Sequence, residues 1–119
     1  LGRRLMGEWT MDFLRAAEFI RTRDPKASIR LRGHRDSGLA ALYSVVLTPE
    51  NIQSADMIDS PVCLVRREPQ QPEEVMTMAL CIPGILAWGD VEHAMSLAKC
   101  RIDVIRPRRA DGSLLSSFP

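Results

Sequence analysis

The sequence has few aromatic residues and almost no net charge. Sixteen basic and fifteen acidic side chains leave a formal net charge of +1, so no overall field attracts nucleic acid or an anionic membrane. Phenylalanine, tryptophan and tyrosine make up 5% of the chain, which argues against a surface that stacks nucleobases. No apolar run has the length of a membrane-spanning helix, and no signal-peptide pattern occurs. We therefore expect neither a nucleic-acid partner nor a membrane partner.

Cysteine is also scarce, and its spacing is informative. Cys63, Cys81 and Cys100 are an odd number of residues, widely separated, and each lies in an apolar neighbourhood. This pattern predicts neither a disulfide framework nor a metal site. We interpret the three residues as small buried hydrophobic side chains, which favours a reducing compartment such as the cytoplasm. No cofactor is predicted.

What the chain does contain is enough apolar material for a packed core. Its 119 residues are 45% hydrophobic and 26% charged, which is typical of a globular protein rather than a disordered one. The length fits one domain, residues 1–119.

Hydrophobic periodicity predicts helices that alternate with short strands. We expect helices at 10–23, with Thr10 as the cap, at 39–47, at 73–80, and after Asp90, which caps the last one. Strands are expected at 28–32, 55–60 and 100–105, and a surface loop at 66–74. This alternation indicates an α/β fold with a short parallel sheet and helices on its faces.

Three motifs follow one another along the chain. The first is a helix of the form Trp-x-x-Asp-x-x-Arg-Ala, from Trp9 to Ala16. The second is a strand, a Gly-x-Ser-x-Gly-like turn and a helix over 29–47, and the third is a Val-Pro-Gly-x-Leu-x-x-x-Asp-like segment over 82–90 that precedes a strand and an acid-bearing loop. Taken in this order, the three motifs resemble those of α/β-hydrolases of the acetyl-xylan-esterase type, and the resemblance spans about 9 to 115. It implies a partial α/β-hydrolase-like three-layer sandwich that corresponds to the carboxyl-terminal half of that fold.

The nucleophile turn departs from the family pattern. Aligning Gly33 with the first glycine places Arg35 at the position of the nucleophilic serine and Ser37 at the second small position. A guanidinium stays protonated near neutral pH and has no lone pair with which to attack an ester. In this register the chain cannot catalyse acyl transfer.

Ser37 could serve as the nucleophile if the turn is shifted by two residues, with His34 and Asp36 nearby. A triad, however, normally takes its base and acid from separate loops, whereas three neighbours on one turn point apart. We favour Ser37 as a helix cap whose hydroxyl accepts amide hydrogens of the next turn.

The resemblance also assigns an acid and leaves out a base. Asp111 matches the family's acid by position, although it also fits an ordinary Ala-Asp-Gly-Ser turn. His93 lies within the helix that follows Asp90, where we expect a surface residue, and no histidine follows it. The strands and the oxyanion-hole loop that precede the turn in the family are missing as well, so we expect half of a hydrolase fold.

The same turn is a candidate anion site. A strand that runs into Gly33 and a helix that begins near Ser37 leave free amides, and Arg35 could add a bidentate donor for a carboxylate or phosphate. The site would comprise Gly33, Arg35, Ser37 and Gly38. The alternative without a ligand is that Arg35 forms an ion pair with Asp36 or another surface carboxylate. Nucleotide hydrolysis is not expected, because Leu39-Ala40 stand where a phosphate loop has Lys and Ser or Thr.

Three functions remain open at this point. They are a non-catalytic or degenerate hydrolase-like module, a carboxylesterase fragment completed by another segment or chain, and a small-anion or carbohydrate-binding domain. Because only three strands are predicted, we also expect an unpaired sheet edge, with either a second copy of the chain or the missing half of a hydrolase fold as the partner.

Overall fold

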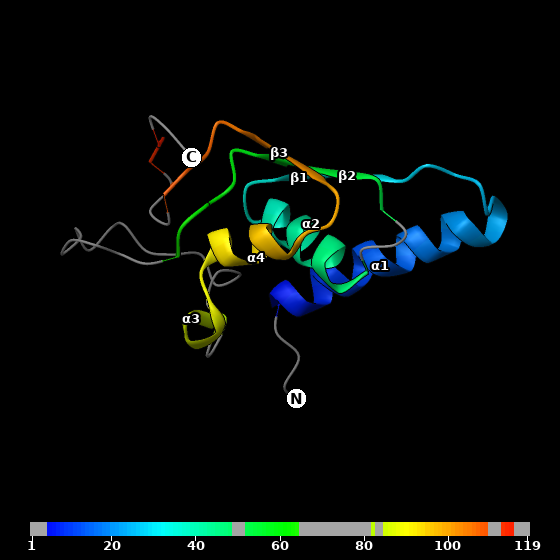
Figure 1. Ribbon diagram of the computed structural model, residues 1–119, viewed down its shortest axis with the longest axis horizontal. Coiled ribbons are helices and arrows are strands. Elements are labelled where there is room, and N and C mark those ends of the chain that lie inside the picture. Colours follow the sequence, from blue (N-terminus) through cyan, green and yellow to red (C-terminus); the bar gives the residue numbers. More distant parts are fainter. Residues whose placement is uncertain (1–4, 49–51, 65–81, 83–84, 110–112, 116–119) are drawn as a thin grey trace.

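The computed structural model of the chain describes residues 5–48, 52–64, 82, 85–109 and 113–115 (Figure 1). The predicted helix at 73–80, the loop at 66–74, Cys81 and Asp111 lie outside the described residues.

Three parallel strands form the sheet. They are β1 (Arg30–His34), β2 (Ser54–Ile58) and β3 (Arg101–Ile105), arranged in the order β1-β2-β3. In the register, Arg30 lies beside Ser54 and Ser54 beside Arg101. The predicted α/β fold with a short parallel sheet is confirmed.

The helices lie on one side of this sheet. They are α1 (Leu5–Arg23), α2 (Asp36–Leu47), α3 (Ile85–Trp88) and α4 (Val91–Leu97). Helix α2 packs on β1 and β2, and α1 and α4 pack on α2 (Figure 1). The part of the chain that the structure describes places no helix on the other face, so the second helix layer implied by the resemblance is not seen there.

The core lies between α2 and the sheet. Leu39, Leu42 and Val45 of α2 are completely buried, as are Ala55 and Met57 of β2. Along β1, exposed and buried residues alternate, because successive side chains of a strand point to opposite faces. One face of the sheet therefore meets the apolar helix, and the other carries charged side chains.

Several predicted boundaries were displaced. Helix α1 begins at Leu5 rather than at residue 10, and Thr10 is therefore not its cap: the buried Thr10 hydroxyl donates to the Met6 carbonyl within the helix, at 2.8 Å. Helix α2 begins at Asp36, three residues before the predicted start. Strand β1 extends to His34, so Gly33 belongs to the strand and not to the turn.

Asp90 caps α4 as predicted. Its Oδ1 accepts the amide hydrogens of Val91, at 2.7 Å, and of Leu64, at 2.8 Å. The cap therefore also fixes the segment that follows β2. Cys63 is half-buried, and its thiol donates to Asp90 Oδ2 at 3.3 Å.

Candidate functional site at the carboxyl edge of the sheet

A single residue, Arg35, connects β1 to α2. Strand β1 ends at His34 and α2 begins at Asp36. Arg35 has φ 52° and ψ −122°, a backbone conformation that residues other than glycine rarely adopt. Its amide donates to the Ile58 carbonyl at 2.8 Å, and its carbonyl accepts from the Gly38 amide at 3.1 Å. These two bonds hold the chain in a sharp strand-to-helix turn.

Two glycines make the turn possible. A Cβ atom at Gly33 would overlap the carbonyl oxygen of Ser37, and one at Gly38 would overlap the hydroxyl of Ser60. Both positions therefore need glycine for close approach of the backbone. The two glycines around the turn thus meet a steric requirement of the backbone.

Ser37 lies in the first turn of α2 and bonds backward to the strand. Its hydroxyl accepts the His34 amide hydrogen at 2.9 Å and donates to the His34 carbonyl at 2.7 Å. The interpretation of Ser37 as a cap for the following turn was wrong, since the hydroxyl joins the strand to the helix instead. Its proton is directed at a carbonyl oxygen, which cannot serve as a general base.

The side chain of Arg35 is exposed, and no described residue lies within ion-pair distance of its guanidinium. The expected surface pair with Asp36 is not formed. Asp36 is half-buried in the first turn of α2. The turn therefore presents one uncompensated positive charge beside the amino terminus of a helix.

The other two strands end in the same way as β1. Asp59 follows β2 with φ 52°, and Arg106 follows β3 with φ 50°. The Asp59 amide donates to the Ile105 carbonyl at 2.9 Å, as the Arg35 amide does to Ile58. The three neighbouring strands thus end at the same level of the sheet, and each is followed by a charged residue with a positive φ.

Asp59 is the most strongly held charge at this edge. Its carboxylate accepts two hydrogen bonds from Arg106, both at 3.0 Å, and two from Arg108, at 2.9 Å from Nη2 and 3.3 Å from Nε. These bonds, first that of Arg106 and then that of Arg108, hold the pKa of Asp59 far below its usual range. In turn, the bond to Asp59 raises the pKa of Arg106.

Sequence reasoning missed this cluster, although a signal was present. Asp59 lies near the end of the predicted strand at 55–60, and Arg106 and Arg108 come just after the predicted strand at 100–105. The carboxyl ends of parallel strands meet at one edge of a sheet, where ligands commonly bind.

The remaining predicted residues are placed as follows. His93 is an exposed residue of α4, as predicted, and its ring meets the edge of Trp88 with 4.8 Å between centroids. Asp111 lies outside the described residues. Within those residues, no three His, Cys, Asp or Glu side chains are grouped so that they could hold a metal ion, and no helix is long and apolar enough to cross a membrane.

No known protein family, no curated protein and no solved structure matches the chain.

Proposed function

We propose that this chain is a non-catalytic α/β-hydrolase-like module related to acetyl xylan esterases. The observation that carries the proposal is the backbone of Arg35. In α/β-hydrolases the nucleophile occupies a sharp, strained turn between a strand and a helix, and Arg35 has that type of conformation at that type of junction. The order of the three sequence motifs along the chain also supports the relationship.

The chemistry of the turn supports the absence of catalysis. A guanidinium cannot attack an acyl carbon. Ser37, the nearest hydroxyl in sequence, is occupied by both polar groups of the His34 backbone. An active serine needs a base that accepts its proton, whereas this hydroxyl donates its hydrogen bond to the carbonyl oxygen of His34.

Fluorophosphonate labelling of the chain tests the proposal. We expect no labelling and no hydrolysis of p-nitrophenyl acetate above the rate given by the Ser37→Ala variant, which serves as the matched control. Stoichiometric labelling of Ser37 would contradict the proposal. That result would favour the alternative of a carboxylesterase fragment completed by another segment or chain.

The exposed guanidinium of Arg35 favours a second candidate function, the binding of a small anion or of an acidic carbohydrate. Arg35 and the amides at the start of α2 would supply the donors. Titration with phosphate, sulfate and acetate, followed by amide chemical shifts, tests this function. The shifts should centre on 35–38 and disappear in Arg35→Gln, and shifts confined to other segments would count against it.

We also propose that the chain forms a homo-oligomer. In the described part of the chain, β1 and β3 each pair with a strand on one side only. An unpaired strand edge can add a strand from a second copy, most simply about a two-fold axis. Light scattering at micromolar concentration should show a dimer, and a persistent monomer with exchange-protected amides on both edge strands would contradict this proposal.

A further inference from the structure

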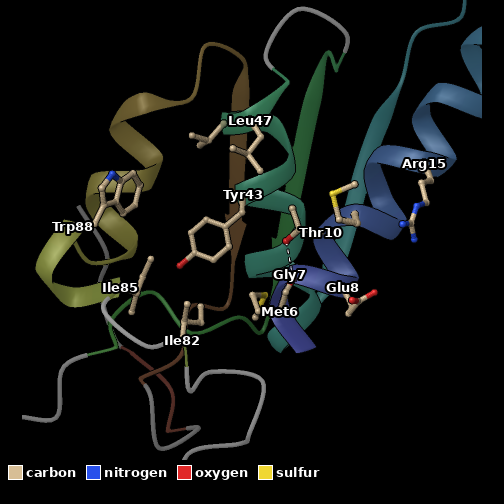
Figure 2. Close-up of a pocket in the computed structure, with 12 residues that line it drawn as sticks. Met6, Gly7, Glu8, Thr10, Arg15, Tyr43, Leu47, Ile82, Ile85 and Trp88 are labelled. Atoms are coloured by element: carbon tan, nitrogen blue, oxygen red, sulfur yellow. Dashed lines mark hydrogen bonds between the residues drawn. The ribbon is translucent and has the colours of Figure 1, made fainter. Parts of the chain in front are cut away.

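A cavity of 720 Å³ lies between α1, α2 and α3 (Figure 2). Its walls include Tyr43 and Val46 of α2, which are half-buried, whereas Leu39 and Leu42 of the same helix are completely buried. The cavity therefore uses a different face of α2 from the core. It is also separate from the turn at Arg35, which lies before the first residue of that helix.

The size and lining of this cavity suit a small organic molecule. Small-molecule sites typically occupy about 300–1,000 Å³ and combine apolar walls with a few polar groups. The apolar lining residues are Met6, Met11, Val46, Leu47, Ile82, Ile85 and Trp88. Three of them, Met11, Leu47 and Trp88, keep between 44% and 66% of their surface exposed, so the walls lack an apolar partner within the described structure.

The hydroxyl of Tyr43 points into this space, which Glu8, Thr10 and Arg15 also line. Figure 2 shows the ring extending from α2 toward α3, with the oxygen at its inner end. That hydroxyl forms no hydrogen bond with any described residue. Buried tyrosine hydroxyls usually find a partner, because an unmade hydrogen bond in a place shielded from water is costly. An acceptor, or a hydroxyl, on a molecule bound in the cavity would complete this hydrogen bond.

The local charge indicates what kind of acceptor fits. Burial, and then the nearby carboxylate of Asp90, raise the pKa of Tyr43 to about 12. The same two conditions oppose a second negative charge next to the phenol oxygen. A neutral oxygen is therefore favoured over a carboxylate at this position.

We propose that the cavity binds a neutral, mostly apolar molecule with one oxygen acceptor, such as a ketone, an ester or an ether, whose oxygen accepts the hydrogen bond of Tyr43. The apolar part of the molecule lies against Met6, Met11 and Trp88. This inference does not depend on the proposed hydrolase relationship.

Methionine methyl groups give a direct test with 2-nonanone as the probe. In protein labelled with ¹³C at the methionine methyls, 2-nonanone should change the methyl chemical shifts of Met6 and Met11, which line the cavity. The methyl chemical shift of Met57, which is buried in the sheet, should stay unchanged. The absence of shifts at both Met6 and Met11 would overturn the proposal.

Two variants, a control variant and one competing probe sharpen the result. Tyr43→Phe removes only the hydroxyl and should weaken 2-nonanone binding about three- to tenfold, the range that one hydrogen bond contributes. Val46→Trp should fill the space and abolish the shifts, and it still decides the matter if Tyr43→Phe does not fold. Phe19→Ala, an exposed position on α1 outside the cavity, should bind as the parent does.

Unchanged binding in Tyr43→Phe, retained binding in Val46→Trp, or tighter binding of nonanoate than of 2-nonanone would each overturn the proposal.

Discussion

The carboxylate of Asp56 is completely buried on the helix-free face of the sheet because the guanidinium of Arg30 lies across it. Arg30 Nη2 is 2.8 Å from Oδ1, and Arg30 Nε is 3.2 Å from Oδ2. Arg32 adds a third contact at 3.2 Å from the same strand. Both arginines remain more than half exposed. The central strand therefore carries a charge that its neighbours shield from water, in a place where no described helix covers the sheet.

Replacing Asp56 should weaken the fold measurably. Asp56→Ala leaves two guanidinium groups without their shared carboxylate, and hydrogen bonds to charged groups contribute roughly 1.5–3 kcal/mol each when shielded. Because the arginines are exposed, we expect a loss of about 1–3 kcal/mol in the free energy of unfolding, measured by urea denaturation. Asp103→Ala, which removes a carboxylate that is 26% exposed, is the control and should cost less. Equal losses in the two variants would contradict this account.

Stability should fall in acid. Bonds to Arg30 lower the pKa of Asp56, and bonds to Arg106 lower that of Asp59. A carboxyl whose folded pKa lies below its unfolded value of about 3.9 stabilises the fold above that pH, and this contribution is lost as the pH falls toward the folded pKa. The unfolding temperature should therefore be steady from about pH 6 to 5 and decrease below about pH 4. Asp59→Asn should show a shallower decrease, and a parallel curve for this variant would refute the assignment.

Gly33 and Gly7 should respond in opposite directions to alanine. At Gly33 the added methyl collides with the backbone of Ser37, so Gly33→Ala should destabilise the fold by several kcal/mol or prevent folding. At Gly7, within α1, a Cβ meets nothing within 4 Å, and Gly7→Ala should stabilise by about 0.5–1 kcal/mol through helix propensity. Thermal unfolding of both variants is the measurement. A stable Gly33→Ala variant would show that the strand-to-helix turn is looser than the structure indicates.

Arg35→Gly should stabilise the chain. A non-glycine residue with this positive φ stores roughly 1–3 kcal/mol of strain, part of which is offset by the greater freedom of glycine in the unfolded state. We expect a net gain of about 1 kcal/mol by chemical denaturation. Arg35→Ala, which removes the charge and retains the strain, should show no such gain. If both variants behave alike, the backbone at this position is not strained.

The sequence permitted prediction of the strands because they depend on local patterns. Alternation around Leu31 identified β1, whereas Arg35 was placed at the turn only through the resemblance, by aligning Gly33 with the first glycine of the family motif. The boundaries shifted because a one-residue turn is tighter than the polar run 33–38 suggested. Helix α2 therefore begins as soon as the chain has reversed, and Ser37 bonds back to the strand.

The pairing of Asp56 with Arg30 could not be predicted in the same way. The two residues are 26 positions apart and meet only because β1 and β2 pair in one register. The same holds for Asp59 and Arg106, which are 47 positions apart. Nor does any local pattern indicate that Tyr43 faces a cavity, since that depends on where α1 and α3 pack. Long-range contacts of this kind follow from topology, which periodicity alone does not determine.

The common level at which the three strands end affects how the fold could tolerate insertions. The connection from β1 to β2 has 19 residues (35–53), and that from β2 to β3 has 42 residues (59–100), yet both leave the sheet through a charged residue of positive φ. Strand register is set by the paired residues themselves, so connections of very different length are compatible with the same sheet. Extra segments could therefore be accommodated within either connection, beyond the bonded turn at 35–38, while the strands keep their alignment.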